Sequence, residues 1–106
     1  MEWMSENYKL IISKDAWDDI DTYIGFITET CDAPITGKKH YDSLLKKLEN
    51  IQKNPTANAI RKNVSLLKYG CNVRRANFKK MAIIYTINGD TVYIHRLIAG
   101  KLITGI

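Results

Sequence analysis

The sequence lacks several features that would assign it to a class at once. Its two cysteines, Cys31 and Cys71, do not have the spacing of a metal-binding motif. In a small chain without a secretory signal, we expect them to be buried free thiols rather than a disulfide. The first eight residues, MEWMSENY, are acidic and lack the apolar core of a signal peptide, and no apolar run approaches the length of a membrane span. These absences predict a cytoplasmic protein without membrane contact, metal or other cofactor.

Nothing along the chain marks an internal boundary. The sequence contains no repeat, no low-complexity segment and no linker-like stretch, so we expect a single domain over residues 1–106. Hydrophobic residues make up 45% of the sequence. That fraction suffices for a small core, and we therefore expect modest stability.

Acidic residues are almost missing from the second half. Residues 1–53 hold 7 Lys/Arg and 10 Asp/Glu, whereas residues 54–106 hold 9 Lys/Arg and 1 acid, Asp90. The halves therefore carry formal charges of −3 and +8, which together give the +5 of the chain. This asymmetry predicts a positive surface that meets a polyanion, usually nucleic acid, or that an acidic partner covers.

The clearest local pattern is a β-hairpin near the C-terminus. Two apolar-rich runs, Met81–Ile87 and Thr91–Ile98, flank Asn88-Gly89-Asp90. Asn-Gly between such runs favours a type I′ turn with Asn88 and Gly89 as the loop, so that Ile87 faces Asp90.

Alternation along this hairpin sorts its side chains into two faces. The expected core face carries Met81, Ile83, Tyr85, Val92, Ile94 and Ile98, with Arg96 at its edge. The other face is half polar, where a ligand could sit, and carries Lys80, Ala82, Ile84, Thr86, Thr91, Tyr93, His95 and Leu97.

Two amphipathic helices precede the hairpin. A short strand, Tyr8–Ile12, leads to Ser13 as the helix N-cap, and the first helix ends at residues 31–34. Its apolar stripe contains Trp17, Ile20, Ile24 and Ile27. We interpret the acids Asp18, Asp19 and Asp21 as a solvated helix face rather than a metal site, because no second group of ligands accompanies them.

The second helix is expected from about Thr36 to Lys53, with an apolar stripe of Tyr41, Leu44, Leu45, Leu48 and Ile51. Opposite it, Lys39, Asp42, Lys46, Glu49 and Lys53 form a solvent-facing charge ladder. We then expect a strand over Tyr69–Arg75 and a turn near Ala76-Asn77.

The order strand, helix, helix and three antiparallel strands predicts an α+β fold. The two helices are expected to cover one face of the sheet and to leave the other face open and basic. Trp17, Ile20, Ile24, Leu44, Leu48 and Ile51 are expected to bury Met81, Ile83, Tyr85, Val92 and Ile94.

This ordered set of segments resembles the RelE/ParE toxin superfamily over nearly the whole chain. The carrying segments are YKLIISKDAWDDIDTYIGFI, the Leu-rich second helix ending in Asn-Pro, Val73-Arg74-Arg75, Phe78 with Ile84-Tyr85, and Gly89–Arg96. The resemblance implies a type II toxin, held inactive in a hetero-oligomer by an antitoxin encoded beside it.

Within this superfamily, RelE-like members cleave mRNA on the ribosome, and ParE-like members bind DNA gyrase. Where RelE-like members commonly carry Arg and His, this chain has Ala82 and Ala99, and its tail offers neither Tyr nor His. We therefore favour a binding toxin over a ribonuclease. A non-toxic basic module that binds nucleic acid is the third interpretation.

Two sets of candidate site residues follow. If the protein is a nuclease, proton transfer and charge stabilisation at the RNA phosphate would fall to His95, Lys80 and Arg75. For contact with a target or nucleic acid, the candidates are Arg61, Lys62, Arg74, Arg75, Lys79, Lys80 and Tyr93. Alternation places Arg74 and Arg75 on opposite faces, so we expect one on the basic surface and the other at a salt bridge or sheet edge. We expect a structural ion pair for Arg96.

Overall fold

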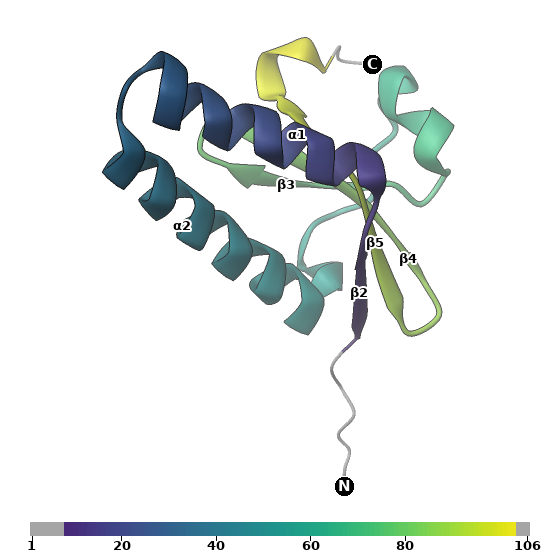
Figure 1. Cartoon of the computed structure of the whole chain (residues 1–106). Coiled ribbons are helices and arrows are strands. Elements are labelled where there is room, and N and C mark those ends of the chain that lie inside the picture. The colour runs from purple at the N-terminus through teal and green to yellow at the C-terminus, as the bar shows by residue number, and fades with distance from the viewer. Residues whose placement is uncertain (1–7, 104–106) are drawn as a thin grey trace, which may run out of the picture.

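The structure is a computed structural model that describes residues 8–103 (Figure 1). Its long elements are strand β2 (Lys9–Ile12), helix α1 (Lys14–Gly25), helix α2 (Pro34–Lys53) and strands β3 (Arg74–Phe78), β4 (Met81–Asn88) and β5 (Thr91–Ala99). A π-helical turn, η1 (Phe26–Thr30), extends α1, and three short 3₁₀ turns follow: η2 (Pro55–Ala57), η3 (Val64–Tyr69) and η4 (Gly100–Leu102). Within residues 8–103, no helix combines the length and apolar character needed to cross a membrane.

The strands form one four-stranded sheet in the order β2-β5-β4-β3. β2 runs parallel to β5, and the other neighbours are antiparallel. Helices α1 and α2 form an antiparallel pair on one face of this sheet (Figure 1). The predicted α+β fold and its element order are therefore confirmed.

Helix α1 begins as expected, because the Ser13 hydroxyl accepts a hydrogen bond from the Ala16 amide at 3.0 Å. The stripe that faces the sheet is rotated from the expected one: Ala16 and Ile20 are buried, whereas the Trp17 side chain is 39% exposed. Asp19 is also turned inward, so its assignment to the solvated face is wrong. Asp18 and Asp21 are exposed as predicted.

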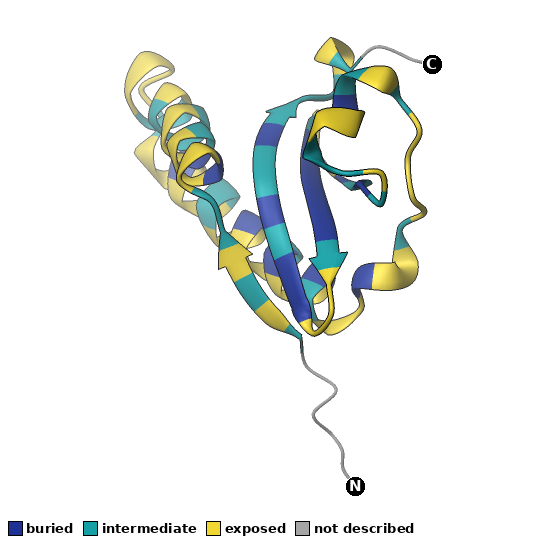
Figure 2. Ribbon diagram, turned by 90° about the vertical axis from the view of Figure 1, so that its right-hand side faces the viewer, coloured by how far each residue is buried: buried dark blue, intermediate teal, exposed yellow. Residues whose placement is uncertain are grey.

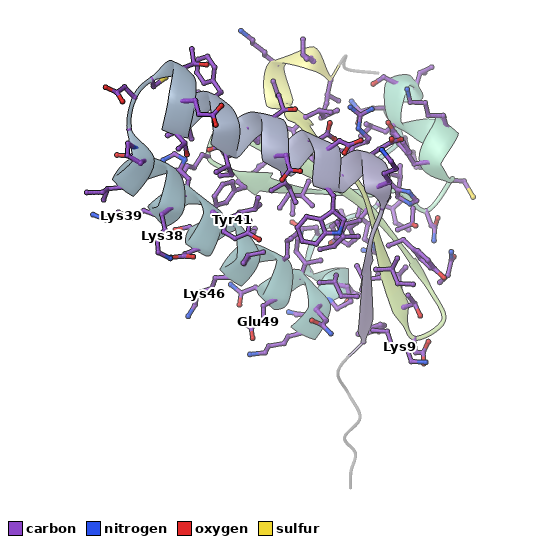
Figure 3. All side chains as sticks on the ribbon, viewed as in Figure 1. Lys9, Lys38, Lys39, Tyr41, Lys46 and Glu49 are labelled. Atoms are coloured by element: carbon purple, nitrogen blue, oxygen red, sulfur yellow. The ribbon has the colours of Figure 1, made fainter. Side chains whose placement is uncertain are left out.

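Helix α2 starts two residues earlier than expected, with Pro34 in its first turn, where the missing N–H needs no partner. Leu44, Leu48 and Ile51 are buried, while Leu45, expected in the stripe, is exposed. The predicted charge ladder is exposed to solvent. Lys38, Lys39, Lys46 and Glu49 project from the outer side of the helix (Figure 3).

The core lies between the helices and the sheet. Its buried members are Ala16, Ile20, Leu44, Leu48, Ile51, Ala76, Phe78, Ile83, Tyr85, Val92, Ile94 and Leu97, with Ile24 and Met81 packed at its margin. The predicted contact of the hairpin face with both helices is thus confirmed, except at Trp17. The Tyr85 hydroxyl donates to the Pro55 carbonyl at 2.6 Å, so this buried phenol is hydrogen-bonded.

The β4–β5 turn differs from the predicted type I′ turn. Asn88 pairs with Thr91, so the loop is Gly89-Asp90, and only Gly89 has a positive φ, of 59°. Positive φ at the first central residue alone is the pattern of a type II′ turn. The true register is displaced by two residues from the expected one. Because side chains alternate with a period of two, the predicted faces survive this error.

A β-bulge in β5 changes the faces beyond the middle of the strand. Tyr85 pairs with Ile94 and Ile84 pairs with Arg96, so the strand-pairing register between β4 and β5 skips His95. After this extra residue the alternation is inverted. Leu97 therefore lies in the core and Ile98 on the opposite face, the reverse of the prediction.

The second face of the sheet is covered rather than open, which corrects the expectation. Leu66, Val73, Ala82 and Ile84 form a second buried cluster beneath the segment that contains η3. Figure 2 shows β4 as an almost continuous buried strand. The expected strand over residues 69–75 and the turn near residue 76 are also wrong, since β3 spans Arg74–Phe78.

Both cysteines are free, but Cys31 and Cys71 are exposed and not buried. Each lies in a connecting segment outside the two hydrophobic clusters, so neither contributes to the core that we expected it to join.

Candidate functional site

The basic end of the sheet holds a cavity of about 530 Å³, which we call the basic pocket. Three segments meet there: strand β3, the β3–β4 turn, and the end of β5 with η4. The pocket is lined by Arg75, Asn77, Lys79, Lys80, Met81, Ala99, Gly100 and Lys101. It thus brings together three of the predicted site residues, Arg75, Lys79 and Lys80.

The β3–β4 turn positions two of these lysines. Phe78 pairs with Met81, so Lys79 and Lys80 form the two-residue loop. Lys79 has a φ of 55°, a left-handed conformation that is unfavourable for a residue with a Cβ. The β4–β5 turn places Gly89 at the equivalent position. The basic pocket therefore has a strained lysine where the other hairpin has glycine.

Arg75 is the half-buried cation of the pocket. Its Nε donates to the Asn77 side-chain oxygen at 2.9 Å, which orients the guanidinium. Gly100 lies against the other end of this group, since a Cβ at that position would be 2.8 Å from Arg75 Nη2. The Gly100 amide donates to the Lys80 carbonyl at 2.9 Å, tying η4 to the turn. The pocket walls are thus held by hydrogen bonds.

No acidic side chain lines the basic pocket. Within residues 54–103, Arg96 is the cation that pairs closely with a carboxylate: its Nε lies 2.6 Å and its Nη2 2.9 Å from the Asp19 oxygens. This confirms its predicted structural role, and the Asp19 hydrogen bonds raise the pKa of Arg96. The four cations of the pocket therefore have their charges uncompensated within the described chain.

The remaining predicted contact residues lie outside the pocket. Arg74, on the edge strand β3, donates to the Asn58 carbonyl, so the two arginines contact different parts of the molecule. Arg61 and Lys62 are exposed in the segment before η3. Tyr93 pairs with Thr86 near the β4–β5 turn. It lies six residues before Ala99, and at the rise of a strand this separation is roughly 20 Å.

His95 is also separate from the basic pocket. Its Nε2 lies 2.8 Å from the Thr86 hydroxyl, and its ring stacks on Tyr69 with centroids 5.3 Å apart. Burial lowers the pKa of His95, which favours the neutral imidazole. The structure therefore does not bring His95 together with Lys80 and Arg75, the other two residues of the proposed nuclease set.

The basic pocket is suited to binding anions electrostatically. No histidine, acid or tyrosine lines it, so it contains no group that exchanges protons readily near neutral pH. Within residues 8–103, His, Cys, Asp and Glu side chains form no group of three or more that could hold a metal ion. Sequence reasoning missed Asn77, Gly100 and Lys101; of these, Lys101 was visible only as one of the nine bases of the second half.

Comparisons with known proteins agree with this fold. No curated protein matches the sequence. Among solved structures, a chain of the chromosomal ParDE toxin–antitoxin system from P. aeruginosa superposes with a TM-score of 0.71 at 15% sequence identity, covering 89% of this chain and 97% of that one. This similarity shows a common fold. The sequence profile of the ParE toxin of the type II toxin–antitoxin system parDE matches residues 10–101. The chain therefore belongs to the ParE toxin family.

Proposed function

We propose that this protein stops bacterial growth by binding DNA gyrase in the cytoplasm, and that an antitoxin encoded beside it neutralises it. The basic pocket is proposed as part of the surface that contacts the target. The observation that carries the proposal is the composition of this pocket: four cations line it, and none of its lining residues is a histidine, an acid or a tyrosine.

Binding is favoured over RNA cleavage by this composition. Cleavage would need a group that removes the proton of the ribose hydroxyl and another that protonates the leaving oxygen. His95, which the sequence suggested for proton transfer, lies outside the pocket and contacts Thr86 and Tyr69. Cationic side chains without such partners are suited to steering and holding an anionic or acidic surface.

Exposed apolar residues beside basic ones support neutralisation by an acidic, amphipathic antitoxin segment. Val64 is 69% exposed, and Ile60 and Leu67 are also exposed. Val64 and Leu67 are three residues apart in η3 and so share one side of this 3₁₀ turn. Arg61 and Lys62 precede them in sequence. A disordered segment that folds on this surface could bury the apolar side chains and pair with the cations.

The test is induced expression in bacteria at matched protein levels. We expect Arg75→Glu to abolish growth arrest, because charge reversal in the pocket repels the anionic surface of the target. Lys39→Glu, on the exposed side of α2, is the matched control and should remain toxic. His95→Ala should also remain toxic.

The phenotype separates the possible targets. Filamentation with a DNA-damage response is expected for inhibition of gyrase. Rapid arrest of translation with cuts in ribosome-bound mRNA, both lost in His95→Ala alone, would refute the proposal in favour of a ribonuclease. Absence of any growth defect in the unmodified protein would leave the basic nucleic-acid-binding module as the better interpretation.

A further inference from the structure

We propose that the basic pocket is a binding site for a phosphate group, supplied by a nucleic-acid backbone or by a free phosphate compound. The inference goes beyond the proposed function, because it gives the same pocket a phosphate ligand in addition to the protein surface of the target. It concerns a property of the isolated chain, so it is testable without the target or the antitoxin.

The first argument is the charge of the pocket. Arg75, Lys79, Lys80 and Lys101 line one cavity in which no acid is present. Four like charges that share a cavity repel one another, and this repulsion is relieved by a bound anion. A phosphate, with up to two negative charges and several oxygens, compensates more of this charge than a single carboxylate does.

The second argument is the position of Arg75. Its Nε is engaged by Asn77 at 2.9 Å, while no protein acceptor is recorded for its two terminal nitrogens within residues 8–103. An arginine that is half-buried and oriented in this way has lost part of its side-chain freedom before any ligand arrives. Its terminal N–H groups are then available as a fork for two oxygens of one phosphate.

The third argument is the backbone of the pocket. The missing Cβ of Gly100 leaves space for Arg75 Nη2, and the Gly100 amide holds the Lys80 carbonyl at 2.9 Å. Lys79 keeps a left-handed conformation at the turn, although glycine would adopt it without strain. Strained residues tend to cluster at ligand-binding sites. Gly100 thus gives the Arg75 guanidinium room beside the cavity, and Lys79 places a cation there despite its strained backbone.

The experiment uses the full chain labelled with ¹⁵N and follows the Arg75 Nε–H and backbone amide signals by NMR. Inorganic pyrophosphate is the first probe, and acetate at equal ionic strength is the control anion. We expect pyrophosphate to give saturable shifts at Arg75, Lys80 and Gly100. A short single-stranded DNA oligonucleotide is then added as a competitor.

The competition identifies the source of the phosphate. If the oligonucleotide displaces pyrophosphate from the pocket, the ligand chemistry is that of a nucleic-acid backbone. If pyrophosphate binds but the oligonucleotide does not compete, the site takes a free phosphate compound. Both results support the site. Absence of saturable shifts with either probe, or equal shifts with acetate, would overturn it.

Two variants test the geometry. Arg75→Gln should weaken pyrophosphate binding by about tenfold or more, since it removes a charged hydrogen-bond donor. Gly100→Ala keeps every charge but places a Cβ at 2.8 Å from Arg75 Nη2, so it should also weaken binding by displacing the guanidinium. Lys62→Gln, which removes an exposed charge outside the pocket, is the control and should bind as the unmodified chain does.

The variants also separate this inference from the proposed function. If Arg75→Gln and Lys62→Gln weaken binding equally and Gly100→Ala leaves it unchanged, the anion responds to overall charge, and the phosphate site would be wrong. If Arg75→Gln loses phosphate binding but still arrests growth, the phosphate site stands and the pocket is not the contact to the target. An amide spectrum that is otherwise unchanged shows that each variant is folded.

Discussion

At the scale of single residues, Asp19 joins the first helix to the last strand. Its carboxylate accepts hydrogen bonds from Arg96 Nε, Arg96 Nη2 and the Leu97 amide, the last at 2.9 Å. Strand β2 ends at Ile12, so this part of the β5 edge has no neighbouring strand to pair with. Asp19 therefore satisfies a backbone donor beyond the end of β2 and fixes the arginine that follows the bulge.

Removal of the Asp19 carboxylate should destabilise the folded protein. We expect Asp19→Ala to lower the free energy of unfolding by about 2–3 kcal/mol, because it leaves a partly buried cation and an amide without their acceptor. Asp18→Ala is the control on the same helix, since Asp18 pairs with the exposed Lys14 at 3.0 Å and water screens this pair, so its removal should cost much less. Urea unfolding measures both. Equal losses in the two variants would contradict the structural role of Asp19.

His95 makes the stability depend on pH. Burial lowers its folded-state pKa, while the unfolded chain has a histidine pKa of about 6.5. The unfolded state therefore binds a proton first, and stability present above about pH 6.5 is lost as the pH falls towards the folded-state pKa. Urea unfolding at about pH 7.5 and about pH 5.5 should show this loss. The loss should shrink in His95→Gln, and a loss of unchanged size in this variant would contradict its assignment to His95.

At the scale of elements, the two hairpins use the same turn with different residues. Gly89 and Lys79 both occupy the first central position of a two-residue loop, with φ of 59° and 55°. No heavy atom lies within 4 Å of a Cβ built at Gly89, so steric contact with the rest of the protein does not decide its identity. The turns therefore differ in backbone strain and in the contact of Lys79 Nζ with the Phe78 ring, 5.6 Å from its centroid.

Exchange of the two residues tests this strain. Gly89→Lys should lower the free energy of unfolding by about 1–2 kcal/mol, the cost of a left-handed conformation with a Cβ. Lys79→Gly should not lower it, because relief of strain offsets the added freedom of glycine in the unfolded chain. Thermal unfolding of both variants gives the comparison. A loss above about 1 kcal/mol in Lys79→Gly would mean that the Lys79 side chain stabilises the fold.

The elements also show what could be predicted from the sequence. The helices, the final hairpin and most of the core followed from periodicity, and the core face survived a register error because that error was an even number of residues. The bulge at His95 has no local signal, since β-branched and aromatic residues continue through it. The cover over the second face was missed because residues 56–68 lack periodicity. The site residues chosen from the basic half included three of the four cations of the pocket but not Lys101, and no pattern pointed to Gly100.

At the scale of the whole molecule, basic and exposed apolar residues adjoin in the segment before β3, where Arg61 and Lys62 lie between Ile60 and Val64. The second half of the chain carries 9 Lys/Arg and 1 acid, and η3 presents Val64 and Leu67 to solvent in the same half. Partners attracted by the charge therefore also meet apolar side chains. Added salt screens the first contribution and leaves the second in place.

The affinity for the antitoxin should reflect both contributions. For the proposed complex with an antitoxin encoded beside the toxin, we expect the dissociation constant to rise about tenfold or more when salt is raised from about 0.05 M to about 0.5 M. We do not expect complete loss of binding. Val64→Asp with Leu67→Asp should remove much of the binding that remains at high salt. Titration calorimetry measures each case. An affinity independent of salt would contradict the electrostatic contribution.

The parallel pairing of β2 with β5 also governs when the toxin exists as a folded molecule. Residues 9–12 pair with residues 91–94, and a ribosome that adds 5–20 residues per second takes roughly 4–16 s to make the chain between them. During this time β2 has no partner strand. The basic pocket is also incomplete until η4, which follows β5, has been made. Each newly made chain therefore passes several seconds without its complete sheet, and during this time the basic pocket is not available to any ligand.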